Sequence, residues 1–316
     1  MSNPDFLSAI RSKLGTWPGY QQIPLNPIRD LIRLKLRVFV SLISNVFKMS
    51  FSDWQALIQS NRKSGTFTGR ILVLANGPSV NSLSVQQIQN FINGGGKLAV
   101  MNGYVESPLS EIFIPDFYFM MDPVNWALPK SGDFVFKDRL EGYLNDNGSK
   151  ITFVQPVRLP KYSPGHGEYL MVSSLCSSGL FRAKNPFICW GLASSTMLVS
   201  LAVLKRLGFN QIFVGGVDGN SYLNYEVDSL NQINFKGSYH HFYEEAGLDE
   251  NDAQSSHFGV DFNPSILRGI HDVLYAEAIL RRDFHDISQG KFFNVTGGLQ
   301  NDLMPQVSLV SGKFEN

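Results

Sequence analysis

Short polar side chains stand beside glycine or proline at three places in the first half of the chain. Each follows a run of apolar residues; the motifs are Asn76-Gly77-Pro78-Ser79, Asn102-Gly103 and Asp122-Pro123. Any one of them fits an ordinary Asx-turn. Because a small turn after a buried strand lets backbone N–H groups face a phosphate or a ribose, the three turns together predict one ligand-binding edge.

A fourth motif places a carboxylate among glycines. Asp218 stands in the segment Gly216-Val217-Asp218-Gly219, again after an apolar run. Small neighbours allow a ligand to approach the backbone closely. An aspartate in that setting can serve as a base, a nucleophile or an anchor for a hydroxyl group, and the spacing leaves these roles open.

Histidine is the natural general base for a reaction near neutral pH. His257 follows Gln254-Ser255-Ser256 in a polar segment and is the candidate for that role. The pair His240-His241 fits either a contact with acceptor or phosphate, or a solvated surface. Together with His257 the pair matches no standard zinc spacing, so no metal site is expected.

Alternating strands and helices must position these residues. The pattern predicts strands at 70–74, 97–101, 117–121, 151–154, 211–215 and 291–295, and helices at 84–93, 194–207 and 264–282. Strands that alternate with helices are typical of an α/β protein with a Rossmann-like, doubly wound, mainly parallel sheet. Ligands bind such sheets at the carboxyl ends of the strands, which is where the polar motifs fall.

The chain divides at about residue 65. Residues 1–65 form a basic amphipathic helical N-terminal segment, with Arg29, Arg33 and Arg37 at helical spacing. This segment either contacts an anionic membrane surface as a peripheral element or packs on the main domain. Residues 66–316 form the catalytic domain, in which two long polar stretches, at about 156–190 and 219–263, are predicted lid loops.

Composition excludes some classes of partner and indicates a compartment. Lys plus Arg and Asp plus Glu both number 27, so the formal net charge is zero and no nucleic-acid partner is expected. The two cysteines, Cys176 and Cys189, match no zinc or redox spacing. A reducing, cytoplasmic location is the simpler interpretation.

The ordered series of motifs resembles the bacterial sialyltransferases that act on lipooligosaccharides. The resemblance covers roughly residues 70–300 and includes Asn76 to Ser79, Asn102, Ala193-Ser194-Ser195, Gly216-Val217-Asp218 and Ser256-His257-Phe258. Related patterns occur in Kdo transferases of similar fold and in pterin-pyrophosphokinase-like domains of flagellin-glycosylation proteins.

The resemblance implies a role for each matching residue. The turn from Asn76 to Ser79, with Asn102, would hold the phosphate and the donor sugar. Ser194 and Ser195 would face the donor, and His257 would deprotonate the acceptor hydroxyl. The family has tyrosines just past the Gly-x-Asp strand end that help the phosphate to leave. This chain departs from that pattern with Gly219-Asn220-Ser221-Tyr222, so Tyr222 is the candidate there.

These observations favour a metal-independent glycosyltransferase that moves an ulosonic acid, of the sialic acid or Kdo type, from a CMP donor to a bacterial surface glycan. The chain has no Asp-x-Asp motif, which metal-dependent glycosyltransferases usually present, and no cofactor beyond the donor is expected. Inversion with His257 as base and retention with Asp218 as nucleophile both remain open.

Two other functions remain open. A pterin-pyrophosphokinase-like enzyme using Mg²⁺ and ATP would need clustered carboxylates, which Asp122, Asp218 and Asp228 could supply. A non-catalytic accessory module of glycan or flagellin modification would keep the fold without the chemistry.

Overall fold

The computed structural model describes residues 47, 49–121, 135–157, 167–173, 184–187, 189–190, 196–218, 225–227, 233–235, 292–296, 304–310 and 313–315. The predicted basic helix near residue 30 and the predicted helix at 264–282 lie outside these residues. No helix in the described part of the chain has both the length and the apolar character needed to cross a membrane.

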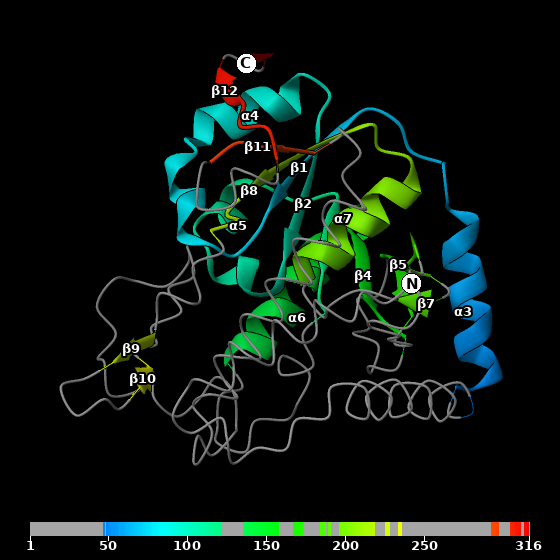
Figure 1. The fold of residues 1–316 in the computed structure, drawn as a ribbon. Helices are drawn as coiled ribbons and strands as arrows, with labels where there is room; N and C mark the ends of the chain where they lie inside the picture. Colours follow the sequence, from blue (N-terminus) through cyan, green and yellow to red (C-terminus); the bar gives the residue numbers. More distant parts are fainter. Residues whose placement is uncertain are drawn as a thin grey trace, which may run out of the picture.

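A seven-stranded sheet organises the described residues, and every neighbouring pair of its strands is parallel (Figure 1). Its order is β11-β8-β1-β2-β3-β4-β5. The strands are β1 (Arg70–Leu74), β2 (Lys97–Met101), β3 (Phe117–Phe119), β4 (Thr152–Pro156), β5 (Glu168–Val172), β8 (Gln211–Gly215) and β11 (Phe292–Asn294). The predicted α/β fold with a parallel sheet is therefore confirmed.

The order of the strands reverses between β1 and β8. The chain adds β2, β3, β4 and β5 on one side of β1, then returns to place β8 and β11 on the other side. Leu74 at the end of β1 is in register with Gly215 of β8 and with Val100 of β2. A reversal of this kind opens a crevice at the carboxyl ends of the two strands, which is the usual ligand site of doubly wound sheets.

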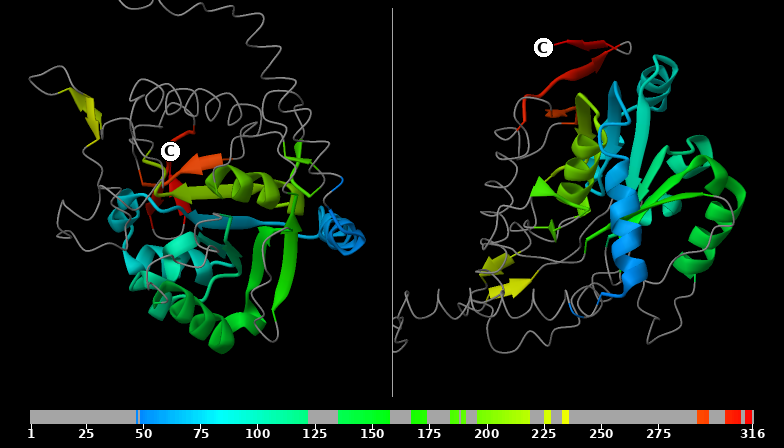
Figure 2. Two further views of the ribbon diagram at one scale, coloured as in Figure 1. Left: turned by 90° about the horizontal axis from the view of Figure 1, so that it is seen from below. Right: turned by 90° about the vertical axis from the view of Figure 1, so that its right-hand side faces the viewer.

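Helices cover both faces of the sheet. The helices α4 (Val85–Asn93) and α6 (Val135–Asn147) pack on the face that carries Leu72 and Leu98, near the short helix α5 (Leu109–Ile112). The opposite face, with Ile71 and Val73, packs against α7 (Thr196–Leu207). Figure 2 shows α6 and α7 on opposite sides of the strands. Strands buried on both faces explain the nearly continuous apolar runs in the sequence.

Local sequence signals set the start of α4. The Ser84 side chain accepts a hydrogen bond from the N–H of Gln87, whose own side chain accepts from the Ser84 N–H, in a capping box. Ile88 and Phe91, three residues apart, are fully buried against the sheet. The predicted helix at 84–93 is confirmed, with Ser84 as its N-cap, because its capping hydrogen bonds and its apolar stripe are both encoded nearby.

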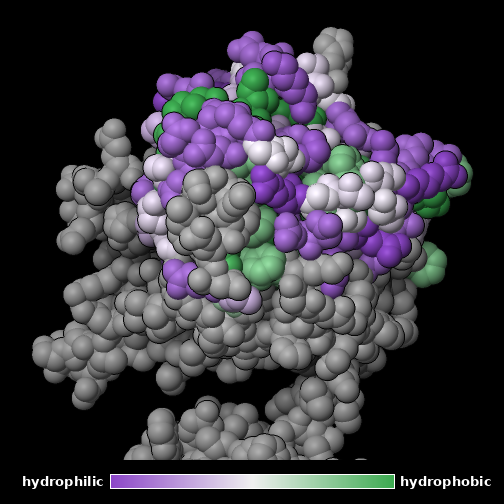
Figure 3. All heavy atoms as spheres, turned by 90° about the horizontal axis from the view of Figure 1, so that it is seen from above, coloured by the Kyte–Doolittle hydropathy of each residue, from purple (hydrophilic) through white to green (hydrophobic). Residues whose placement is uncertain are grey.

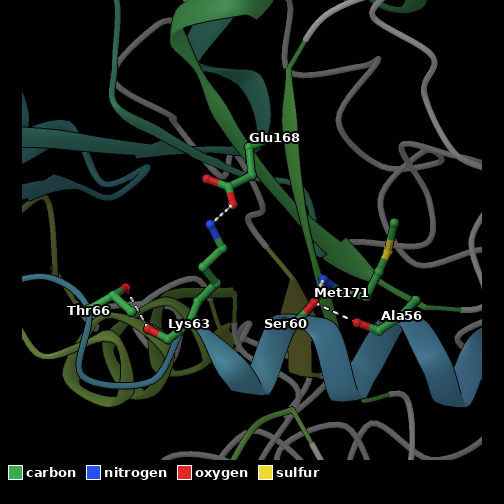
Figure 4. Close-up of polar contacts among 6 residues, drawn as sticks. All are labelled: Ala56, Ser60, Lys63, Thr66, Glu168 and Met171. Atoms are coloured by element: carbon green, nitrogen blue, oxygen red, sulfur yellow. Dashed lines mark hydrogen bonds and ion pairs between the residues drawn. The ribbon is translucent and has the colours of Figure 1, made fainter.

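The helix α3 (Phe51–Arg62) covers the outer edge of β5 (Figure 4). The Met171 N–H donates a hydrogen bond of 2.7 Å to Ser60 Oγ, and that hydroxyl donates to the Ala56 carbonyl at 2.9 Å. Lys63 and Glu168 add an ion pair of 2.6 Å. The end of the 1–65 segment thus packs on the sheet domain and satisfies an edge strand that would otherwise be open to pairing.

Several described elements were not predicted. The stretch 156–190, which is predicted as a lid loop, contains β5 of the main sheet together with β6 (Lys184–Asn185) and β7 (Cys189–Trp190). In the stretch 219–263, β9 (Tyr225–Val227) and β10 (Ile233–Phe235) form an antiparallel pair, as do β12 (Ser308–Val310) and β13 (Lys313–Glu315) nearer the C-terminus. Seen from above, the described surface is mainly hydrophilic with small separate hydrophobic areas (Figure 3).

Candidate functional site

The turn after β1 continues the pairing with β8 beyond the ends of both strands. The Ala75 N–H donates to the Gly215 carbonyl at 2.9 Å, and the Gly77 N–H donates to the Gly216 carbonyl at 3.0 Å. The chain then enters a short 3₁₀ helix, η2 (Pro78–Ser82). This turn therefore lies at the point where the strand order reverses.

Asp218 ties the end of β8 to this helix. Its Oδ2 atom accepts a hydrogen bond of 3.0 Å from the backbone N–H of Ser79. The side chain also lies directly over Gly77, where a Cβ atom would stand 2.2 Å from Asp218 Oδ2 and 2.4 Å from the Gly216 carbonyl oxygen. Gly77 has an ordinary backbone conformation, with φ −70° and ψ 148°. Glycine is required here by space alone.

Thr296, just past β11, is a site residue that sequence analysis did not select. Its Oγ1 accepts a hydrogen bond of 3.0 Å from the Gly216 N–H and shares another of 3.0 Å with Ser79 Oγ. The Thr296 N–H donates to Asn294 Oδ1 at 3.1 Å. The sequence feature that could have indicated Thr296 is its hydroxyl group directly after the predicted strand at 291–295, at the same edge of the sheet as Asn76.

Asn102 follows β2 in a left-handed backbone conformation. Its φ of 45° is the one positive value found at a non-glycine residue in the described part of the chain. The buried Tyr118 of β3 donates its hydroxyl to the Asn102 carbonyl, and Asn102 Nδ2 lies 3.4 Å from Thr196 Oγ1 at the start of α7. Strained backbone held by its surroundings is common at ligand sites.

Two asparagine oxygens at neighbouring strand ends are buried without a hydrogen-bond partner. These atoms are Asn76 Oδ1 and Asn102 Oδ1. Each residue lies two positions beyond the last register pair of β1 and β2, Leu74 and Val100, so both follow the same edge of the sheet. A buried acceptor without a partner costs about 1–3 kcal/mol, and a native protein rarely keeps two together without a reason.

The predicted phosphate cradle is not formed by the turn after β1. The N–H groups of Gly77, Ser79 and Val80 donate to the Gly216 carbonyl, Asp218 Oδ2 and the Gly77 carbonyl respectively. Pro78 has no N–H group to donate. These three N–H groups are therefore bonded within the protein, two of them to the end of β8, and do not face a phosphate.

We call Asn76, Ser79, Asn102, Asp218 and Thr296 the strand-end cluster. Its members follow β1, β2, β8 and β11, which are neighbours in the sheet, and hydrogen bonds link Ser79 to Asp218 and to Thr296. Gly77 and Pro78 belong to the same turn.

The other predicted site residues lie outside the described residues: Asp122, Ser194, Ser195, Tyr222 and His257. Within the described part of the chain, no group of three or more histidine, cysteine or acidic side chains is arranged to hold a metal ion.

No family model, curated protein or solved structure matches this chain. The fold and the geometry of the strand-end cluster are accordingly what a proposal about function can use, together with the motif resemblance described above.

Proposed function

We propose that this protein is a glycosyltransferase that moves an ulosonic acid, of the sialic acid or Kdo type, from a CMP donor to a bacterial surface glycan such as lipopolysaccharide or capsule. The observation that supports it most directly is the pair of unpartnered acceptors, Asn76 Oδ1 and Asn102 Oδ1, at the ends of the neighbouring strands β1 and β2, of which β1 borders the switch point of the parallel sheet. Doubly wound sheets bind nucleotides at such points.

Asp218 has a positioning role in this proposal. Its carboxylate holds the turn after β1 through the Ser79 N–H, at 3.0 Å. Attack on the anomeric carbon through this oxygen would break the tie between β8 and η2. The proposal therefore uses a single direct displacement, which inverts the anomeric centre, with His257 taking the proton from the acceptor hydroxyl.

The donor class determines what the rest of the site must supply. A CMP donor leaves as a monophosphate, so hydroxyl groups and helix N-termini can stabilise the departing charge without a metal ion. Ser194, Ser195 and Tyr222 are the proposed groups for this task. In this proposal the enzyme works at the cytoplasmic side of the membrane, and the basic segment at 28–49 attracts it to anionic lipid near lipid-linked acceptors.

The test is release of CMP from CMP-sialic acid and from CMP-Kdo, in EDTA, with and without a crude lipid-linked glycan. Release from one donor that is increased by acceptor supports the proposal. His257→Ala should reduce turnover by about 10²- to 10⁴-fold, the usual contribution of a general base. His285→Ala, the same chemical change at a histidine with no proposed role, is the matched control.

Two results would contradict the proposal. Absence of CMP release from both donors, with thermal stabilisation by ATP and Mg²⁺, would favour the pterin-pyrophosphokinase-like alternative. Release with retention of the anomeric configuration would contradict direct displacement and return Asp218 to the role of nucleophile.

A further inference from the structure

We infer that the side-chain oxygens of Asn76 and Asn102 accept hydrogen bonds from the sugar hydroxyl groups of a nucleoside, and that its phosphate is held elsewhere. This deepens the proposed function, and it depends on that proposal only for the identity of the base.

The two oxygens are acceptors that lack a donor. Asn76 Oδ1 and Asn102 Oδ1 are buried at neighbouring strand ends with no hydrogen-bond partner. A carboxamide oxygen can only accept, so the group that satisfies it must carry an O–H or N–H. The vicinal hydroxyls of a ribose are two such donors on adjacent carbons, which suits two acceptors on adjacent strands.

The surrounding groups disfavour a phosphate at the same place. The N–H groups of Gly77, Ser79 and Val80, which a phosphate would need, are bonded within the protein. The Asp218 carboxylate lies 3.0 Å from the Ser79 nitrogen and adds negative charge at this edge. A phosphate would meet acceptors and a like charge, whereas a neutral hydroxyl pair would meet two acceptors.

The backbone keeps Asn102 in place for this contact. Tyr118 donates its hydroxyl to the Asn102 carbonyl, and Asn102 Nδ2 faces Thr196 Oγ1 at 3.4 Å. With its nitrogen directed at Thr196, the amide keeps its buried oxygen without a donor. A site whose buried acceptors bind the hydroxyl groups of a ligand discriminates strongly against a ligand that lacks those groups, because the acceptors then stay unpaired.

Replacement of asparagine by aspartate distinguishes a ligand contact made by the amide oxygen from one made by the amide NH₂ group. Asn102→Asp and Asn76→Asp keep an acceptor oxygen but replace the amide NH₂ by negative charge. Affinity for cytidine, measured by isothermal titration, should stay within about 3-fold, whereas Asn102→Ala should weaken it on the order of 10- to 100-fold. Asn81→Asp, an exposed asparagine of the same turn, is the control for added charge.

Removal of the ribose hydroxyl groups from the ligand, combined with Asn102→Ala, gives a double-mutant cycle. Cytidine should bind the unmodified protein on the order of 10- to 100-fold more tightly than 2′,3′-dideoxycytidine, and this preference should shrink in Asn102→Ala. Inorganic phosphate should not displace cytidine. Equal binding of the two nucleosides, displacement by phosphate, or loss of cytidine binding in both aspartate variants would overturn the inference.

The same titrations distinguish this inference from the proposed function. Adenosine, guanosine and uridine are titrated alongside cytidine. Hydroxyl-dependent binding of another nucleoside, with no release of CMP from either donor, would refute the CMP-dependent transferase and keep the inference. Release of CMP from a donor, with cytidine and 2′,3′-dideoxycytidine bound equally, would refute the inference and keep the CMP-dependent transferase. Failure of all four nucleosides to bind would overturn the inference.

Discussion

Gly77→Ala should destabilise the protein strongly although the backbone at Gly77 suits any residue. A Cβ atom at this position would lie 2.2 Å from Asp218 Oδ2 and 2.4 Å from the Gly216 carbonyl oxygen. The Asp218 side chain can rotate away, but only by giving up its bond to the Ser79 N–H. The Gly216 carbonyl is backbone, and it accepts from the Gly77 N–H at 3.0 Å.

The expected cost follows from these two obstructions. Inserting a methyl group into a filled space costs about 1–3 kcal/mol. Loss of a hydrogen bond to a carboxylate adds about 1.5–3 kcal/mol. The total of about 2.5–6 kcal/mol is a large part of the roughly 5–15 kcal/mol that keeps a typical domain folded.

Urea denaturation followed by circular dichroism measures this cost, with Gly142→Ala as the matched control. Gly142 lies inside α6, where an added Cβ meets no atom within 4 Å, so alanine there should stabilise by about 0.5–1 kcal/mol. In an Asp218→Ala background, Gly77→Ala should cost about 1–3 kcal/mol, because only the Gly216 obstruction remains. A cost below about 1 kcal/mol in the unmodified protein, or the same cost in both backgrounds, would refute the reasoning.

Three further predictions concern the supports of the site and fold. Ser60→Ala should destabilise by about 1–3 kcal/mol in urea, because it leaves the Met171 N–H without its acceptor; the exposed Ser52→Ala should change stability little. Asn102→Gly should stabilise by up to about 1 kcal/mol while weakening cytidine binding, because glycine adopts the left-handed conformation without strain; a loss of stability would contradict this. Burial raises the pKa of the Tyr104 hydroxyl above its usual value, so its contribution to folding is complete below about pH 10 and is lost as the pH rises further. Urea midpoints at pH 8 and pH 10.5 should therefore differ less in Tyr104→Phe than in the unmodified protein.

Local signals in the sequence were enough for most of the sheet. The strands β1, β2 and β8 have the predicted bounds, because each begins with a polar residue, continues with three or four apolar residues and is followed by a turn. The capping box of Ser84 and Gln87 marked the start of α4. The elements α6 and β5 were missed because their local patterns are weak: α6 has a mainly polar sequence, and β5 stands within a long polar stretch.

The edge of the sheet that holds the site was also predictable, since parallel strands bring their carboxyl ends together. Asn76, Asn102 and Asp218 were expected there from the strand, turn and helix pattern alone. The sequence indicated these three residues, but not Thr296, because apolar periodicity and turn chemistry are local properties.

Only the tertiary structure decided what those residues do. The bond from the Ser79 N–H to Asp218 joins residues 139 positions apart, and the bond between Ser79 and Thr296 joins residues 217 positions apart. No local sequence pattern predicts that the N–H groups of the turn donate to these distant residues. None predicts that the side-chain oxygens of Asn76 and Asn102 have no hydrogen-bond partner. Hydrogen-bond partners are set by which strands become neighbours, and that order follows from packing of the whole sheet.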